Sequence, residues 1–311
     1  MRTRRMVGFT VAMALGAIVC VSGQVSIEPR ARRVPKEPVA RPGTLRTETK
    51  LVLVPVTVTD ARSRPVVGLE KEHFRVFDNK VEQTITAFSM EDEPVAVGFV
   101  FDTSGSMGGT LGAARSAAQQ FFINGEPDDE YCLVEFDSRP RLVVPLTGDT
   151  HELEYQLMFT HSGGSTALLD AVYLALTEMR KSKKTKKALV IISDGGDNHS
   201  RYSEREVKNL LRETDTLIYS VATGGDWAGE NLLKRIAEET GGLLLRAEAA
   251  DYSDIAKKIV IDLRNRYVLG YVPQDRQTDG KYHRVQVQLL PPRGLVGIRA
   301  HWRLGYYAPE N

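Results

Sequence analysis

Oxygen-bearing side chains recur in three short segments, two of which directly follow apolar runs. Asp102, Ser104 and Ser106 alternate after the run 95–101, and Asp194 comes soon after the run 188–192. Between them, Gly163-Gly164-Ser165-Thr166 leads into a helix-like pattern. Carboxylate and hydroxyl oxygens with no His or Cys among them suit Mg²⁺, Mn²⁺ or Ca²⁺ and disfavour zinc or copper. These residue types therefore predict a divalent-cation site.

The middle of the chain alternates strand and helix patterns that would position these segments. The continuous apolar runs 95–101 and 188–192 are typical of strands buried on both faces. Further strands are expected over 131–136, 142–146, 217–221 and 243–245, and helices over 111–122, 166–180, 204–212, 231–239 and 251–266. Such alternation predicts an α/β fold with a doubly wound, mostly parallel sheet. Ligands of such sheets bind at the carboxyl ends of the strands, where Asp102 and Asp194 lie.

The two flanks of this region have strand periodicity instead. Strands are expected over 51–59, 74–77 and 83–88 before it, and over 267–272, 284–289 and 297–303 after it. Each flank is too small to bury a core comfortably by itself. We therefore expect 47–92 and 267–311 to pair into one small β-sandwich-like unit, with the α/β domain over 93–266 inserted in it.

The N-terminus resembles an export signal. Arg2, Arg4 and Arg5 precede the apolar run 6–21, which ends in small residues, so we expect a signal peptide over 1–23. An uncleaved anchor is the alternative, although the run is short for a bilayer span. Residues 24–46, rich in Pro and Arg, predict an extended linker. The mature protein is then periplasmic or extracellular, and its membrane contact is at most through this N-terminal segment.

Composition restricts the class of protein. The chain has 311 residues, 42% of them hydrophobic and 26% charged, which fits roughly two globular domains. Two cysteines exclude a disulfide scaffold, and Cys132 in its apolar run is expected to be a buried small side chain. Residues 1–46 hold nine Lys/Arg and two Asp/Glu, leaving 32 of the 41 basic and 38 of the 40 acidic residues to the remainder. This mildly acidic remainder argues against nucleic-acid binding.

The five candidate ligands resemble a known motif. Asp102-x-Ser104-x-Ser106, Thr166 and Asp194 are similar, at all five positions, to the metal-ion-dependent adhesion site of von Willebrand factor type A domains. The resemblance covers roughly 93–266. It implies a doubly wound α/β fold in which the Ser104, Ser106 and Thr166 hydroxyls contact the metal directly or through water. It also implies that Asp102 and Asp194 partly act by holding waters and hydroxyls, and that an acidic side chain of a protein partner completes the coordination sphere.

Two details depend on this resemblance. Thr166 is preferred over its neighbour Ser165 because Ala167-Leu168 resembles the usual continuation of the family motif. The whole chain further resembles bacterial VWFA-related domain proteins of acidobacterial type, through the segments 267–271 and 305–309. That second resemblance implies no defined biochemical role.

We therefore expect an exported, Mg²⁺-dependent protein-binding module that is not an enzyme, with Mn²⁺ or Ca²⁺ as alternative cations. Its partner-binding rim is expected at Met107, Gly108, Gly164, Ser165 and Gly195. A structural or assembly protein of the cell envelope that does not use the metal face is the first alternative. A metal-assisted hydrolase is the second, although no Gly-x-Ser-x-Gly, Walker A or His-Glu-x-x-His motif occurs.

Three other features are expected to be structural. Asp137 and Asp197-Asn198 are interpreted as turn residues, with an additional role at the site as the alternative. The basic run 181–187 is interpreted as a solvated turn. Tyr306 and Tyr307 are expected to pack against the end of the fold instead of forming a binding patch.

Overall fold

The computed structural model describes residues 51–308 except 91–92, 248–251, 275–279 and 293. By contacts, the chain divides into the units Met1–Thr47 and Glu48–Asn311, and the description below concerns the second. The signal peptide predicted over 1–23 and the linker predicted over 24–46 lie outside the described residues. Within the described part, no helix is both long enough and apolar enough to cross a membrane.

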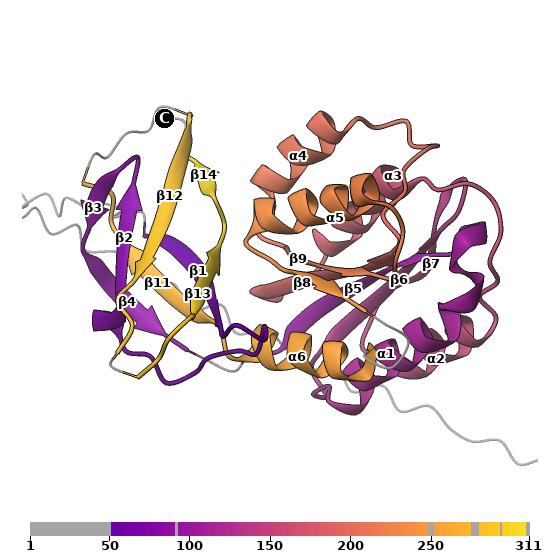
Figure 1. The fold of residues 1–311 in the computed structure, drawn as a ribbon, viewed down its shortest axis with the longest axis horizontal. Helices are drawn as coiled ribbons and strands as arrows, with labels where there is room; N and C mark the ends of the chain where they lie inside the picture. The colour runs from indigo at the N-terminus through magenta and orange to yellow at the C-terminus, as the bar shows by residue number, and fades with distance from the viewer. Residues whose placement is uncertain (1–50, 91–92, 248–251, 275–279, 293, 309–311) are drawn as a thin grey trace, which may run out of the picture. The chain divides into compact units, whose positions relative to one another are not determined.

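A six-stranded sheet in the order β10-β9-β8-β5-β6-β7 forms the centre of the α/β region (Figure 1). All neighbours pair in parallel except β7, which returns antiparallel to β6. The strands are β5 Val95–Asp102, β6 Glu130–Phe136, β7 Pro140–Thr147, β8 Lys186–Ser193, β9 Leu217–Ala222 and β10 Leu244–Arg246. The helices are α1 Leu111–Ile123, α2 Thr150–Met158, α3 Leu168–Met179, α4 Glu204–Glu213, α5 Trp227–Thr240 and α6 Tyr252–Arg264.

Helices cover both faces of this sheet because its central strands are apolar on both sides. Every residue of β5 is buried. Val97, Phe99 and Phe101 pack with α1, α2 and α6, whereas Ala96 and Val100 pack with α3, α4 and α5. The two helical layers lie on opposite sides of the sheet in Figure 1. The predicted doubly wound α/β fold is confirmed.

Two antiparallel sheets, in the orders β13-β1-β11-β4 and β14-β12-β2-β3, are built from the flanks. Both mix strands from the two ends of the chain, since β1 pairs with β11 and β2 with β12. Their inner faces share one apolar core that includes Val56, Val76 and Leu269. The strands are β1 Val52–Thr59, β2 Phe74–Asp78, β3 Val81–Gln83, β4 Ile85–Ser89, β11 Tyr267–Tyr271, β12 Tyr282–Leu289, β13 Arg299–Trp302 and β14 Gly305–Tyr307. The exact domain limits at 93 and 266 stay a prediction.

Three elements differ from the sequence-based expectation. Helix α2 is not predicted, because only Leu153 and Leu157 of its nine residues are buried. Helix α5 begins one turn before the apolar stripe, where the Asp226 side chain caps it by accepting from the Gly229 N–H. The single strand expected over 83–88 is divided into β3 and β4, which pair with different partners and lie in different sheets.

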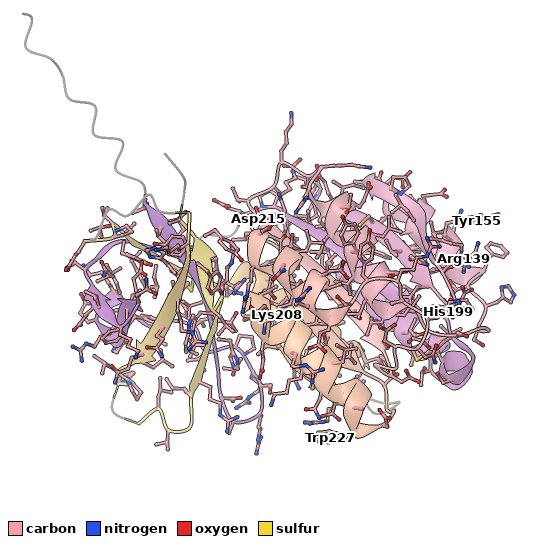
Figure 2. All side chains as sticks on the ribbon, turned by 90° about the horizontal axis from the view of Figure 1, so that it is seen from above. Arg139, Tyr155, His199, Lys208, Asp215 and Trp227 are labelled. Atoms are coloured by element: carbon pink, nitrogen blue, oxygen red, sulfur yellow. The ribbon has the colours of Figure 1, made fainter. Side chains whose placement is uncertain are left out.

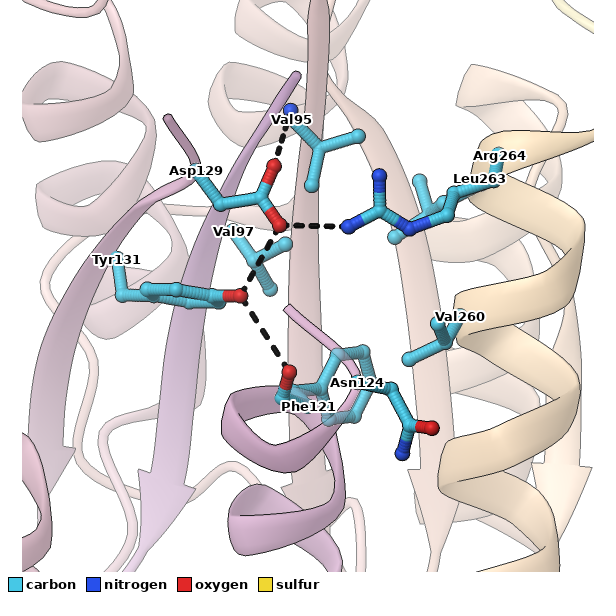
Figure 3. A pocket seen from close by; sticks show the side chains of 9 residues that line it. All are labelled: Val95, Val97, Phe121, Asn124, Asp129, Tyr131, Val260, Leu263 and Arg264. Carbon is cyan, nitrogen blue, oxygen red and sulfur yellow. Dashed lines mark hydrogen bonds and ion pairs between the residues drawn. The ribbon is translucent and has the colours of Figure 1, made fainter. Parts of the chain in front are cut away.

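A buried carboxylate joins the amino-terminal ends of β5 and β6 to the end of α6 (Figure 3). Asp129 Oδ1 accepts from the Val95 N–H at 2.9 Å, and its Oδ2 accepts from Arg264 Nη2 at 2.6 Å. The same Oδ2 accepts from the Tyr131 hydroxyl at 3.3 Å. Burial and the Asp129 charge raise the pKa of Tyr131, which keeps its hydroxyl protonated as a donor. The Asp129 side chain is fully buried and that of Arg264 is 13% exposed.

We predict that Asp129→Ala destabilises the fold by about 3 kcal/mol, because it leaves the largely buried Arg264 guanidinium without this carboxylate. The measurement is urea unfolding followed by circular dichroism. The control is Arg75→Ala, which removes an exposed ion pair to Glu82 at 2.6 Å and is expected to leave the midpoint nearly unchanged. Equal midpoints for Asp129→Ala and the parent protein would show that the network adds no net stability.

Candidate metal face at the carboxyl edge of the sheet

The three predicted segments meet at one edge of the sheet. Strands β5 and β8 are parallel neighbours, so Asp102 and Ser193 end them side by side. The loop 163–166 is tied to the first segment by two backbone hydrogen bonds. Gly163 N–H donates to Thr103 C=O at 2.7 Å, and Gly105 N–H donates to Gly164 C=O at 3.2 Å. The topology and these two bonds bring the segments together.

The Asp102 carboxylate is the innermost group of this edge, with no exposed surface. Its Oδ1 accepts from the Ser104 N–H at 2.9 Å, and its Oδ2 accepts from the Ser193 hydroxyl at 2.6 Å. Burial raises the pKa of Asp102, the hydrogen bonds from Ser104 and Ser193 oppose that rise, and the negative charge of Asp194 adds to it. No basic side chain among the described residues pairs with Asp102, so its charge lacks compensation.

The other three candidate ligands bear hydroxyl groups and lie on two loops at this edge. Ser104 Oγ and Ser106 Oγ lie 3.2 Å apart, the first buried and the second on an exposed residue. Thr166 is 5% exposed, and its backbone N–H donates to Asn198 Oδ1 at 3.0 Å. Its C=O accepts from the backbone N–H groups of Asn198 and His199, both at 3.0 Å. Asn198 therefore fixes the position of Thr166.

Sequence reasoning missed the roles of Ser193 and Asn198. The sequence predicted Asn198 to be a turn residue, with a role at the site as the alternative. In the structure its side chain accepts from the Thr166 N–H and so positions Thr166. Ser193 also accepts from the Gly195 N–H at 2.9 Å, besides donating to Asp102. The sequence did offer a signal for Ser193. It is a hydroxyl residue at the end of a buried strand that is expected beside the strand ending at Asp102.

Asp194 lies in a loop whose backbone packs directly against the loop that follows β9. A Cβ on Gly195 would lie 2.3 Å from the Gly229 carbonyl oxygen, and one on Gly225 would lie 2.3 Å from the Asp194 carbonyl oxygen. Both glycines have positive φ angles, +82° and +93° respectively. Only glycine combines a positive φ angle with such a close backbone contact. The contacts of Gly195 and Gly225 therefore fix the backbone of Asp194 at this edge. Asp194 itself is half-buried, and its Oδ1 accepts from the Gly196 N–H at 3.2 Å.

The expected rim requires a correction at two positions. Met107 is 1% exposed, and its Sδ lies 3.2 Å from Thr223 Oγ1 inside the core, so it supports the loop from below. Gly195 is buried against Gly229. Gly108 and Gly164 are exposed and Ser165 is half-buried, so these three remain accessible at the edge.

The donor set fits a hard divalent cation. Carboxylate and hydroxyl oxygens around a buried charge are the ligands that Mg²⁺ prefers. Over the described ranges, no group of three or more His, Cys, Asp or Glu side chains is arranged to hold a metal. A cation at this edge would therefore depend on the Ser104, Ser106 and Thr166 hydroxyls as well as on the two carboxylates.

We predict that Ser193→Ala lowers the free energy of unfolding by about 1–3 kcal/mol in buffer with EDTA. The substitution deprives the buried Asp102 carboxylate and the Gly195 N–H of their hydrogen-bond partner. Urea unfolding measures the loss. Ser165→Ala, a hydroxyl deletion at the same edge on a half-buried residue, is the control and should stay within about 0.5 kcal/mol. Equal losses in both variants would contradict the role assigned to Ser193.

Comparisons with known proteins agree with this architecture. Residues 97–196 match the family model of the von Willebrand factor type A domain. The solved structure of a von Willebrand factor type A protein from Catenulispora acidiphila is 13% identical, with a TM-score of 0.52, over 84% of this chain and 64% of that one. The vWF domain of the type V pili tip protein Mfa5 from Porphyromonas gingivalis is 15% identical, with a TM-score of 0.46, over 55% of this chain and 96% of that one.

One curated relative, an uncharacterized protein from Borreliella burgdorferi, is 27% identical over 134 residues. The match spans 40% of this chain and 39% of that relative's own length. At 13% identity, the likeness to the Catenulispora acidiphila structure concerns the fold alone. The topology, the edge that gathers Asp102, Thr166 and Asp194, and the family match lead to one conclusion: residues 97–196 match the von Willebrand factor type A family, and the central part of this chain has the fold of such a domain.

Proposed function

We propose that this protein is an exported, divalent-cation-dependent binding module for protein partners. A cation held by Asp102, Ser104, Ser106, Thr166 and Asp194 would accept a carboxylate of the partner. The observation that carries the proposal is the Asp102 carboxylate, which is fully buried beside hydroxyl oxygens without a basic partner in the described residues.

The cation in this proposal is Mg²⁺, with Mn²⁺ or Ca²⁺ as alternatives. Mg²⁺ requires near-octahedral oxygen coordination and keeps several waters, so few direct protein ligands suffice. When bound, it supplies a Lewis-acidic position for an external carboxylate oxygen. The five residues would hold the cation, whose positive charge would balance that of Asp102. The exposed Gly108 and Gly164, which have no side chains, leave the solvent side of the edge open to a partner.

The match of residues 97–196 to the von Willebrand factor type A family supports protein binding as the general role, because domains of this kind generally bind protein partners. An acidic group on the partner is the complement of a cation at the edge. The mildly acidic composition beyond residue 46 gives no support to nucleic acid as a partner. The segment 1–23, which lies outside the described residues, supports export to the periplasm or the medium.

We expect calorimetric titration of the full chain with Mn²⁺ to show one site, which Asp102→Ala abolishes. Because Asp102 is buried, Ser106→Ala at an exposed position is the second variant and should weaken binding without lowering the urea midpoint. Asp137→Asn, which alters a carboxylate of the neighbouring turn outside the proposed set, is the matched control. Unchanged Mn²⁺ affinity in both Asp102→Ala and Ser106→Ala would refute the metal face.

The open coordination position is tested on the Mn²⁺-loaded protein by water-proton relaxation. A capped Gly-Glu-Gly peptide should reduce the relaxation enhancement, because its carboxylate replaces a water on the metal, whereas the Gln twin should not. An identical response to both peptides, or to neither, would contradict recognition of a partner carboxylate even where the cation binds.

A further inference from the structure

A second polar cavity lies away from the metal face, between the end of α4 and strand β14. Its volume is about 490 Å³. Its walls include the guanidinium-bearing residues Arg212 and Arg303, the rings of Tyr306 and Tyr307, and Glu213. None of these residues belongs to the candidate metal set, so the cavity requires its own explanation.

Arg303 is the least satisfied charged side chain of the cavity wall. Its Nη2 donates to the Arg212 carbonyl oxygen, and its Nε–H is buried with no acceptor. Burial lowers the pKa of Arg303, and the electrostatic effects of Tyr282 and Asp215 oppose that fall. Within the residues that the structure describes, no carboxylate lies within ion-pair distance of this half-buried side chain.

The neighbouring ion pairs leave an excess of positive charge. Glu239 is shared by two cations, Arg212 Nε at 2.6 Å and Lys208 Nζ at 3.0 Å. Glu213 faces Arg180 at 4.0 Å and is 59% exposed, so its charge is largely solvated. Asp215, whose charge acts on Arg303, pairs with Lys187 Nζ at 3.5 Å and is 65% exposed; Figure 2 labels it together with Lys208. The carboxylates nearby are therefore already engaged or solvated, and Arg303 retains its charge on the cavity wall.

Aromatic rings supply the rest of the wall. The Arg212 guanidinium lies 4.7 Å from the centroid of the Tyr282 ring, and the rings of Tyr282 and Tyr307 meet edge to face at 5.2 Å. Tyr307 is 42% exposed, so its ring is available to a ligand. An arginine beside an aromatic wall suits an anion attached to an apolar body.

We propose that this cavity binds a small organic carboxylate with an aromatic or aliphatic body. The carboxylate meets the Arg303 guanidinium on the cavity wall, and the body packs on the Tyr306 and Tyr307 rings. A monoanion is preferred over a phosphate because Glu213 is also part of the wall and repels a higher negative charge. The proposal is independent of the metal face.

The test is a titration of the full chain with sodium benzoate, followed by ¹H–¹⁵N NMR of the arginine Nε–H groups. Saturable binding should shift the Arg303 Nε–H signal, and Arg303→Gln should weaken binding roughly tenfold or more. Because Arg303 is largely buried, Tyr307→Ala at an exposed position is the second variant and should weaken binding several-fold without lowering the urea midpoint. Arg75→Gln, which removes an exposed cation whose partner Glu82 does not line the cavity, should bind as the parent does.

Two comparison ligands make the outcome specific. Benzyl alcohol should bind far more weakly than benzoate, and inorganic phosphate should not displace benzoate at equal concentration. Equal binding of benzyl alcohol, displacement by phosphate, or benzoate affinity that neither Arg303→Gln nor Tyr307→Ala changes would each overturn the proposal.

Discussion

The hydrogen bond from the Ser193 hydroxyl to Asp102 Oδ2, at 2.6 Å, is the interaction on which the candidate site depends. It joins the carboxyl ends of the adjacent strands β5 and β8. The strand order reverses between these two strands, because β6 and β7 are added on one side of β5 and β8 to β10 on the other. Apolar packing on both faces of β5 buries the Asp102 carboxylate completely, and the loops beyond the strand ends must then satisfy it. The Ser104 N–H and the Ser193 hydroxyl meet that requirement.

Asp262 is a second buried carboxylate in this protein, and it has both hydrogen-bond donors and a positively charged neighbour. Asp262 on α6 accepts from the hydroxyls of Thr57 and Tyr219, which connects β1 of the flanking sheets to β9 of the central sheet. Burial raises its pKa, and the positive charge of Arg266 opposes that rise. Asp102 has comparable hydrogen bonds, but its charged neighbour is Asp194. Asp102 therefore lacks the positively charged neighbour that Asp262 has.

Patterns along the chain predicted the fold, and placed Asp102, Thr166 and Asp194 at one edge of the sheet, because each signal was local. That these residues hold a metal stays a prediction. The run 95–101 is apolar throughout since it is buried on both faces, and Asp102 marks its carboxyl end. Contacts between distant residues were beyond such reasoning. Asn198 positions Thr166 across 32 residues, and Met107 enters the core to meet Thr223 across 116 residues. The periodicity of the sequence does not indicate that Asn198 positions Thr166 or that Met107 is buried.

Buried charge in this protein is generally compensated, which makes the exceptions informative. Asp129 pairs with Arg264, and Glu239 with both Arg212 and Lys208. Asp102 has no basic partner among the described residues, and Arg303 has a buried Nε–H without an acceptor, as Arg115 and Arg266 also have. Asp102 lies beside an accessible edge, and Arg303 lies beside a cavity. The favourable packing around each residue offsets the free-energy cost of burying its charge. An uncompensated charge beside an accessible edge or cavity is stabilised by a ligand of opposite charge, so these two places are where this fold would bind one.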